Sequence, residues 1–181
     1  SNIMFVTQAK PVGFGDAIEY GKRFVTNDYF LLHAGDDIVI SNENSHLSRL
    51  ESCFKKYKAD IACLIEKVEN PSQYGVVSGE LLEDGIIDIK KIEEKPKKPK
   101  SKNAVIAIYI FKPKIFNYLS QVKKKSSAQN QLSDAFDMAL KKGDRMIGVI
   151  LNKNEKRIDI GTPETYSKLL VSLKWKRKKF Q

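Results

Sequence analysis

The sequence has few of the residues with which proteins build metal centres or disulfide frameworks. Its 181 residues include two cysteines and two histidines. Neither Cys53 nor Cys63 has a histidine at the spacing of a zinc site, and free cysteines are usually buried. We therefore predict that both are buried, reduced thiols, and we assign no chemistry to His33 or His46.

Long apolar runs are also missing from the sequence. No stretch approaches the roughly 18 residues that a membrane-spanning helix needs, and Ser1 to Met4 lack the charged-then-apolar layout of a signal peptide. The hydrophobic content of 41% is ordinary for a globular protein. We expect a soluble cytoplasmic protein without a membrane partner, formed by a single domain over residues 1–181 that can bury a real core.

Acidic residues are fewer than basic ones, and the 32 lysines and arginines leave a formal net charge of +10. Much of the excess lies in two runs, Lys95 to Lys102 and Lys174 to Lys179, and the second run contains Trp175. Nucleic-acid binding by stacking needs aromatic residues spread along a groove, whereas this run holds one aromatic in a terminal tail. We therefore expect a small phosphorylated partner rather than nucleic acid, and interpret the tail as a solvated helix end.

Short apolar runs alternate with helical patterns along the chain. Residues 29–34 form a continuous apolar run stopped by Gly35, which is typical of a strand buried on both faces of a parallel sheet. Similar strands are predicted at 61–65, 105–111 and 147–151, a half-exposed strand or hairpin at 86–92, and helices at 17–25, 45–57, 132–140 and after Thr162. This alternation predicts a layered α/β domain with its ligand site at the carboxyl ends of the strands.

Acidic residues follow two of these strands. Asp36 and Asp37 come after the first strand and a glycine, and Asp159 ends a short strand before Gly161. Carboxylates held at a sheet edge suit Mg²⁺, which takes one or two of them and leaves its other positions to phosphate and water. A different interpretation stays open, in which Asp37 caps a turn and Asp159 accepts hydrogen bonds from backbone amides.

A glycine-rich turn lies near the start of the chain, where Gly13 and Gly15 flank Phe14 before a helical pattern. Glycine lets the backbone approach a flat ligand closely, and the side chain of Gln8 offers both a donor and an acceptor to the edge of a base. This turn is therefore a candidate base-binding segment. A plain strand-to-helix turn is the alternative.

An acid and a lysine, Glu94 and Lys95, stand side by side before Pro96 at the end of a strand-like segment. Neighbouring strand residues point to opposite faces, so the two can approach one sugar phosphate only if the strand bends there. Lysine would neutralise the phosphate, and glutamate would accept hydroxyl hydrogens. A charged surface turn is the alternative.

These segments together resemble the sugar-1-phosphate nucleotidyltransferases, also called nucleoside-diphosphate-sugar pyrophosphorylases. The resemblance covers nearly the whole chain and is strongest to UTP–glucose-1-phosphate uridylyltransferases and related thymidylyltransferases. It is carried by QAKPVGFGDA, LLHAGDDIVI, VENPSQYGVV, IEEKPKKPKSKNAVIAIYIFKP, QNQLSDAF and RIDIGTPETY. It implies a Rossmann-like three-layer α/β fold with a mixed, mainly parallel sheet, and transfer of a nucleotide from UTP or dTTP to glucose 1-phosphate with release of pyrophosphate.

The resemblance also implies roles for individual residues. It implies nucleotide binding by Gln8, Pro11, Gly13 and Asp36, a Mg²⁺ cofactor on Asp36 and Asp159, sugar-phosphate binding by Gly75, Glu94, Lys95 and Tyr109, and catalysis by Lys95 and Asp36. A homo-oligomer is expected as the assembled form.

The sequence departs from the family pattern at several positions. Ala107 stands where the family has glycine, Lys102 and Gln129 where it has asparagine and glutamate, and Ser133 where it has threonine. The opening strand and the glycine-rich loop that would cradle the β- and γ-phosphates do not occur among these residues. We therefore expect a domain truncated at its N-terminal side with an exposed strand edge, and we keep as an alternative function an inactive relative that acts as a regulatory or assembly subunit.

Overall fold

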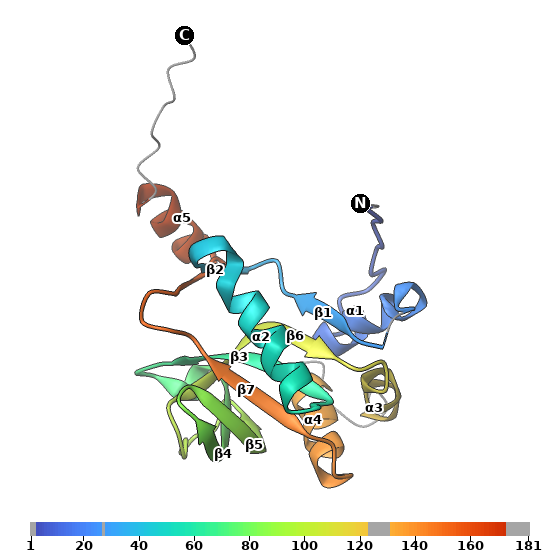
Figure 1. Cartoon of the computed structure of the whole chain (residues 1–181). Coiled ribbons are helices and arrows are strands. Elements are labelled where there is room, and N and C mark those ends of the chain that lie inside the picture. The colour runs from blue at the N-terminus through green and yellow to red at the C-terminus, as the bar shows by residue number, and fades with distance from the viewer. Residues whose placement is uncertain (1–2, 27, 123–130, 173–181) are drawn as a thin grey trace.

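A computed structural model describes residues 3–26, 28–122 and 131–172 (Figure 1). The strands are β1 (Phe30–His33), β2 (Asp37–Ile40), β3 (Ile61–Lys67), β4 (Gly75–Glu83), β5 (Ile86–Glu94), β6 (Asn103–Phe111), β7 (Met146–Ile150) and β8 (Lys156–Asp159). The α-helices are α1 (Phe14–Tyr20), α2 (Ser45–Lys56), α3 (Ile115–Val122), α4 (Gln131–Lys141) and α5 (Pro163–Ser172), joined by the short 3-10 helices η1 (Lys22–Phe24), η2 (Asn42–Asn44) and η3 (Pro71–Gln73).

Six strands form the main sheet in the order β1-β6-β3-β7-β5-β4, and β2 pairs with β8 in a separate two-stranded sheet. The predicted α/β fold is confirmed, but the expectation of a mainly parallel sheet is wrong: among the described strands β3–β7 is the parallel pair and the other pairs are antiparallel. Strands β1, β3 and β7 do run in one direction. The antiparallel pairs arise because β6 inserts between β1 and β3, and the β4–β5 hairpin adds beside β7.

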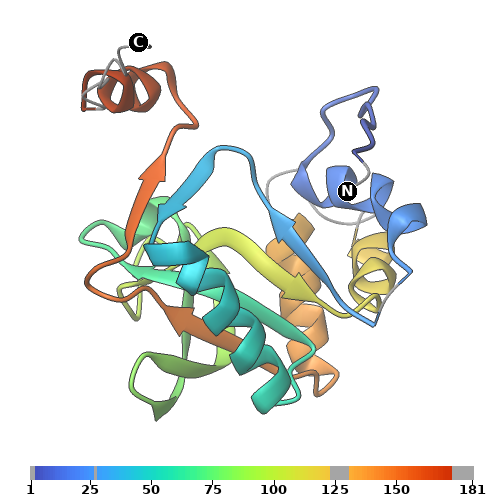
Figure 2. The ribbon, with the colours of Figure 1, turned by 45° about the horizontal axis from the view of Figure 1, so that its top comes forward.

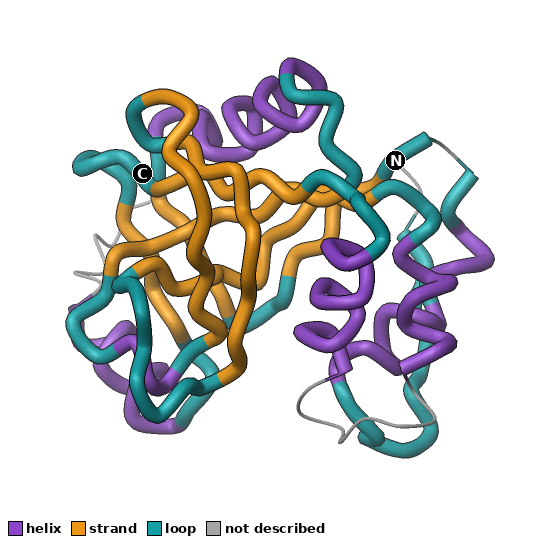
Figure 3. Tube along the Cα trace, turned by 90° about the horizontal axis from the view of Figure 1, so that it is seen from below, coloured by secondary structure: helices purple, strands orange, loops and turns teal. Residues whose placement is uncertain are grey.

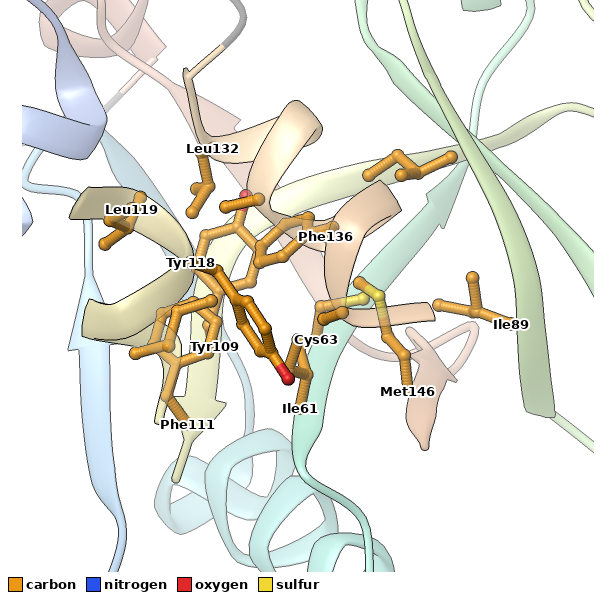
Figure 4. Packing of buried hydrophobic residues seen from close by; sticks show 14 of the residues in the cluster. Ile61, Cys63, Ile89, Tyr109, Phe111, Tyr118, Leu119, Leu132, Phe136 and Met146 are labelled. Carbon is orange, nitrogen blue, oxygen red and sulfur yellow. The ribbon is translucent and has the colours of Figure 1, made fainter. Parts of the chain in front are cut away.

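The sheet is covered by helices on both faces, as the three-layer expectation requires (Figures 2 and 3). Successive side chains of β3 point to opposite faces, and they belong to two different apolar clusters. Cys63 lies in the cluster with α3 and α4, whereas Leu64 lies in the cluster with α2. Figure 4 shows Phe136 of α4 and Leu119 of α3 packed against strand residues of the first cluster.

Strand β1 differs from its prediction, because it lies at the edge of the sheet and is not buried on both faces. Phe30 and Leu32 pack on the core side, and the ring of Phe30 stacks on Phe116 with centroids 5.3 Å apart. On the other face Leu31 is 47% exposed and His33 is exposed as well. The reason is that α2 packs over β3, β6 and β7 and leaves this edge uncovered.

Most predicted elements are found near their expected positions. The strands predicted at 61–65, 105–111 and 147–151 correspond to β3, β6 and β7, and the helices predicted at 45–57 and 132–140 to α2 and α4. Thr162 caps α5, because its Oγ1 accepts a hydrogen bond from the backbone N–H of Thr165 at 3.1 Å. The strand predicted at 86–92 corresponds to β5, and the first helix begins earlier than predicted, at Phe14, while β2, β4 and α3 were not predicted.

The remaining expectations about composition have mixed outcomes. Cys53 and Cys63 are free and buried, as predicted, and burial raises the pKa of both thiols. None of the described helices is long and apolar enough to cross a membrane. The basic run Lys174 to Lys179, with Trp175, lies outside the described residues, as does Gln129.

Candidate functional site

Asp36 and Asp159 lie together, although they are far apart in the sequence. The antiparallel pairing of β2 with β8 places Asp37 opposite Asp159, and the carbonyl oxygen of Asp36 accepts a hydrogen bond from the N–H of Ile160 at 2.8 Å. A Cβ atom added to Gly161 would lie 3.1 Å from Oδ2 of Asp36 and 3.2 Å from Oδ1 of Asp159. The two carboxylates therefore flank one point beside Gly161, while their role as metal ligands stays a prediction.

The chemistry of the Asp36–Asp159 pair fits a divalent cation that takes few ligands from the protein. Asp36 is exposed, and within the described residues its carboxylate makes no hydrogen bond or ion pair. Oδ1 of Asp159 accepts from the N–H of Gly161 at 2.8 Å, as the alternative interpretation expected, and retains further lone pairs. Within the described part of the chain, no three or more acidic, histidine or cysteine side chains are arranged so that they could hold a metal ion, so an ion here would take its remaining ligands from substrate and water.

Arg157 organises the surroundings of these aspartates, and the sequence analysis missed it. Its side chain is 8% exposed, and its nitrogens lie 2.6 Å from Asp37, 3.3 Å from Glu66 and 3.3 Å from Asp159. Burial acts to lower the pKa of Arg157, but the hydrogen bond and charge of Asp37, followed by Glu66, raise it further than burial lowers it. The signal was present in the sequence, because Arg157 and Asp159 are two residues apart in a strand and share a face.

Asp37 is a structural residue in this arrangement. It is buried, one carboxylate oxygen accepts from Arg157, and the other accepts from the backbone N–H of Ala107 at 3.0 Å. The outward carboxylate of the Asp36–Asp37 pair is therefore Asp36. Ala107 stands where the family has glycine. Its backbone amide makes this contact with Asp37, so the methyl group of alanine does not prevent it.

Gly75, Glu94 and Lys95 meet at one end of the β4–β5 hairpin. Gly75 pairs with Glu94, and a Cβ at Gly75 would lie 3.1 Å from Oε2 of Glu94, so glycine leaves room for this carboxylate. Ser133 of α4 donates a hydrogen bond to the same oxygen at 2.9 Å. Ser133, which replaces the family's threonine, keeps a hydroxyl at this position.

The bend that the sequence analysis required after Glu94 is present. Strand β5 ends at Glu94, and Lys95 has a φ of 43°, in the left-handed region that few residues other than glycine adopt. Its backbone N–H donates to the carbonyl oxygen of Tyr74 at 3.0 Å, which fastens the turn to the start of β4. This bend is the condition under which Glu94 and Lys95 could approach one ligand, and their part in binding a sugar phosphate stays a prediction.

Tyr109 is largely buried, and its part in binding a sugar phosphate stays a prediction. Its side chain is 6% exposed, and its ring stacks on Phe111 at 5.3 Å and packs against Phe136 at 5.6 Å (Figure 4). Tyr109 shares a face of β6 with Phe111 because the two are two residues apart, and that face is covered by α4. The ring belongs to the core, and burial raises the pKa of its hydroxyl.

The candidate base-binding segment has a defined internal geometry. The Nε2 atom of Gln8 donates to Oδ2 of Asp16 at 2.7 Å and to the carbonyl oxygen of Gly13 at 3.2 Å. Gly13 has a φ of 130°, which requires glycine, and it precedes the first residue of α1. Pro11 is exposed at the centre of a three-residue turn closed by Val12 N–H and Lys10 C=O at 2.9 Å.

The Asp36–Asp159 pair is linked directly to the group of Gly75, Glu94 and Lys95, and the Gln8 segment is connected to that group through a helix. The guanidinium of Arg157 lies 5.3 Å from the centroid of the Tyr74 ring, so it joins the aspartate pair to the residue before Gly75. Helix α4, which carries Ser133, packs against α1 behind the Gln8 segment. No hydrogen bond or ion pair within the described residues joins Gln8 or Gly13 to Asp36 or Asp159.

Comparison with known proteins agrees with this geometry. Residues 1–174 match the family described as nucleotidyl transferase. A Bacillus subtilis protein provisionally named UTP–glucose-1-phosphate uridylyltransferase is 35% identical over an alignment of 173 residues that covers 94% of this chain and 62% of the relative. A UTP–glucose-1-phosphate uridylyltransferase of Mycoplasma pneumoniae is 31% identical over an alignment of 176 residues that covers 93% of this chain and 58% of that protein.

A solved structure has the same fold. A UDP-glucose pyrophosphorylase complexed with UDP-glucose is 34% identical and superimposes with a TM-score of 0.81, covering 93% of this chain and 65% of that one. The chain thus spans less than two thirds of the length of each of these relatives. The match over nearly all of its own residues shows that the chain belongs to the nucleotidyl transferase family.

Proposed function

We propose that this chain supplies the metal-binding, base-binding and sugar-phosphate-binding residues for transfer of a uridylyl group from UTP to glucose 1-phosphate. The observation that carries the proposal is the convergence of Asp36 and Asp159 on one point beside Gly161. The relatives named for uridylyltransferase activity, and the solved relative complexed with UDP-glucose, support the choice of substrates.

Asp36 and Asp159 would hold Mg²⁺. The cation, when bound, neutralises phosphate charge and aligns the two phosphorylated substrates. Arg157 keeps Asp159 oriented through the contact between its Nη2 and Oδ2 of Asp159, and the N–H of Gly161 fixes the other oxygen. The strands thus present both carboxylates in advance, which lowers the cost of assembling the site when substrate arrives.

Glu94 and Lys95 would hold the sugar phosphate. The carboxylate of Glu94 is fixed by Ser133 and can accept hydrogen bonds from hexose hydroxyls with its remaining lone pairs. The left-handed turn at Lys95 directs the chain away from the strand, so that its ammonium group can neutralise the phosphate that acts as nucleophile. Binding both ends of the hexose phosphate restricts its motion and makes the attack nearly intramolecular.

The reaction itself needs little covalent work from the protein. A phosphate oxygen of glucose 1-phosphate forms a bond to the α-phosphorus of UTP, while the bond from that phosphorus to the bridging oxygen breaks. Pyrophosphate leaves with the bonding electrons. Gln8 and the backbone at Gly13 would hold the base, and since they read an edge that uracil and thymine share, dTTP stays the alternative nucleotide.

The proposal is tested by calorimetric titration of the chain with UDP-glucose in the presence of Mg²⁺. Asp36→Ala and Asp159→Ala are each expected to weaken binding about tenfold or more, because a charge-assisted contact contributes roughly 1.5–3 kcal/mol. Asp84→Ala, which removes an exposed acid in the β4–β5 turn, is the matched control and should bind as the unaltered chain does. Absence of UDP-glucose binding to the unaltered chain at millimolar concentrations would exclude the proposal.

Turnover is tested separately from binding. Release of pyrophosphate from UTP and glucose 1-phosphate would establish the chain as the enzyme, and comparison with dTTP would establish the base. Metal-dependent binding without turnover would instead favour the regulatory or assembly subunit. The homo-oligomer stays a prediction, which light scattering after gel filtration can check.

A further inference from the structure

The carboxamide of Gln8 is held in one of its two possible orientations. Its nitrogen lies 2.7 Å from Oδ2 of Asp16 and 3.2 Å from the carbonyl oxygen of Gly13. An ionised carboxylate and a backbone carbonyl are both acceptors only, so each must face a hydrogen of the amide nitrogen. Both amide hydrogens are used in this way, and the oxygen of Gln8 is left on the opposite side.

The two acceptors are themselves fixed by the fold. Asp16 is 4% exposed and lies in the first turn of α1. The carbonyl of Gly13 also accepts the first hydrogen bond of that helix, from the N–H of Ala17 at 3.2 Å. Turning the amide over would place its oxygen against both acceptors, and the bond to Asp16 is charge-assisted and so about twice as strong as a neutral one.

We propose that Asp16 is a specificity-determining positioning residue, which makes Gln8 present an acceptor, and not a donor, to the base. This inference rests on the proposed function, in which Gln8 contacts the base. An outward oxygen pairs with the N3–H of uracil or thymine. It is repelled by N3 of cytosine, which is an acceptor. Asp16 therefore sets the preference for uracil or thymine over cytosine.

The inference is tested by exchanging Asp16 for its neutral isostere. In Asp16→Asn the new amide can donate to the oxygen of Gln8 as readily as it can accept from its nitrogen, so both orientations of Gln8 become accessible. The ratio of UDP-glucose affinity to CDP-glucose affinity is expected to fall about tenfold, which is the loss of one favoured hydrogen bond. Calorimetry of the full chain with Mg²⁺ measures both affinities, and Asp84→Asn is the matched control that should keep the ratio.

A double-mutant cycle separates positioning from a structural role. If Asp16 acts through Gln8, then Asp16→Asn should not change the ratio further in a chain that already carries Gln8→Ala. A merely structural role of Asp16 would weaken both nucleotide sugars equally and leave the ratio unchanged. An unchanged ratio in Asp16→Asn, with circular dichroism showing a folded chain, overturns the inference.

A ligand-side measurement keeps the inference testable even if Asp16→Asn does not fold. N3-methyl-UDP-glucose lacks the hydrogen that Gln8 would accept, so the unaltered chain should bind it about tenfold or more weakly than UDP-glucose. Equal affinity for the two ligands contradicts the inference alone. Failure of the unaltered chain to bind any of these nucleotide sugars contradicts the proposed function instead.

Discussion

The strand that carries Asp159 is anchored by buried ion pairs, whereas the segment that carries Gln8 lies beside exposed apolar side chains. Arg157 joins Asp159 to Asp37 and Glu66, and Glu155, just before β8, has a fully buried carboxylate that pairs with Arg49 of α2 at 2.5 Å. In contrast, Phe5 is 95% exposed, and it is accompanied by Ile3, Met4 and Val6, which are exposed or partly exposed.

The two regions differ in how firmly the fold holds their residues in place. The aspartate pair is held by contacts that the described residues make among themselves, so its geometry follows from this fold. Apolar side chains that stay exposed, such as Phe5, gain no burial free energy and so do little to hold their segment in place. We therefore expect the Gln8 segment to be the less stably held part of the candidate site, and the three predictions below test that contrast.

The largest effect is expected from Arg157→Met. It leaves Asp37 buried without its cationic partner, and loss of one member of a buried ion pair costs about 3–5 kcal/mol of unfolding free energy. Urea unfolding measures this loss, and Arg157→Lys should recover part of it because a cation is retained. Arg23→Met, on the surface, is the control and should change stability by no more than about 0.5 kcal/mol. A loss below about 1 kcal/mol in Arg157→Met would remove the contrast between the two regions.

A smaller effect is expected from Gly13→Ala. The φ of 130° is sterically unfavourable for alanine, and such strain costs about 1–3 kcal/mol. If the Gln8 segment is the less stably held part, most of that strain will be relieved by local rearrangement. UDP-glucose affinity will then fall while the midpoint of urea unfolding changes little. An equally large loss of global stability would show that this segment is as integral to the fold as β8.

The smallest change in stability is expected at a cluster of ion pairs around Asp60, to which no ligand is assigned. Asp60 accepts from Lys114 at 2.8 Å and Lys112 at 2.9 Å, and also from the backbone N–H of Arg145. Burial acts to raise the pKa of Asp60, but the hydrogen bonds from Lys114, Lys112 and Arg145 outweigh it and lower the pKa from 3.8 to about 2.

Because the folded-state pKa is depressed, this contribution to stability is present above the unfolded value and is lost as pH falls from about 4 to about 2. Lys114→Met should make this acid-dependent loss smaller, by less than about 1 kcal/mol since the group is partly screened by solvent. Urea unfolding at pH 7, 4 and 3 measures it, with Lys98→Met as a control on an exposed loop. An identical pH dependence in Lys114→Met and the unaltered chain would show that Lys114 does not set the pKa of Asp60.

Much of this architecture could be predicted from the order of residues, where local patterns are strong. Alternation of apolar and polar residues located most strands and helices, and Thr162 with Pro163 marked the start of α5. The sequence also indicated the three candidate groups, which are the Gln8 segment, the Asp36–Asp159 pair, and Gly75 with Glu94 and Lys95. Glycine and acidic residues at strand ends are unusual enough to be noticed in a sequence. The need for a bend at Lys95 followed from strand geometry alone.

Other features depended on contacts between distant residues, which no local pattern contains. The position of β1 at the sheet edge is decided by where β6 inserts, and the burial of Tyr109 by which face α4 covers. The clustering of Arg157 with three carboxylates and the orientation of Gln8 by Asp16 likewise appear only in the folded chain. The sequence by itself determined which chemical groups are present and on which elements they lie, because periodicity and turn chemistry are local; tertiary structure alone decided which groups meet, because packing joins residues regardless of their separation.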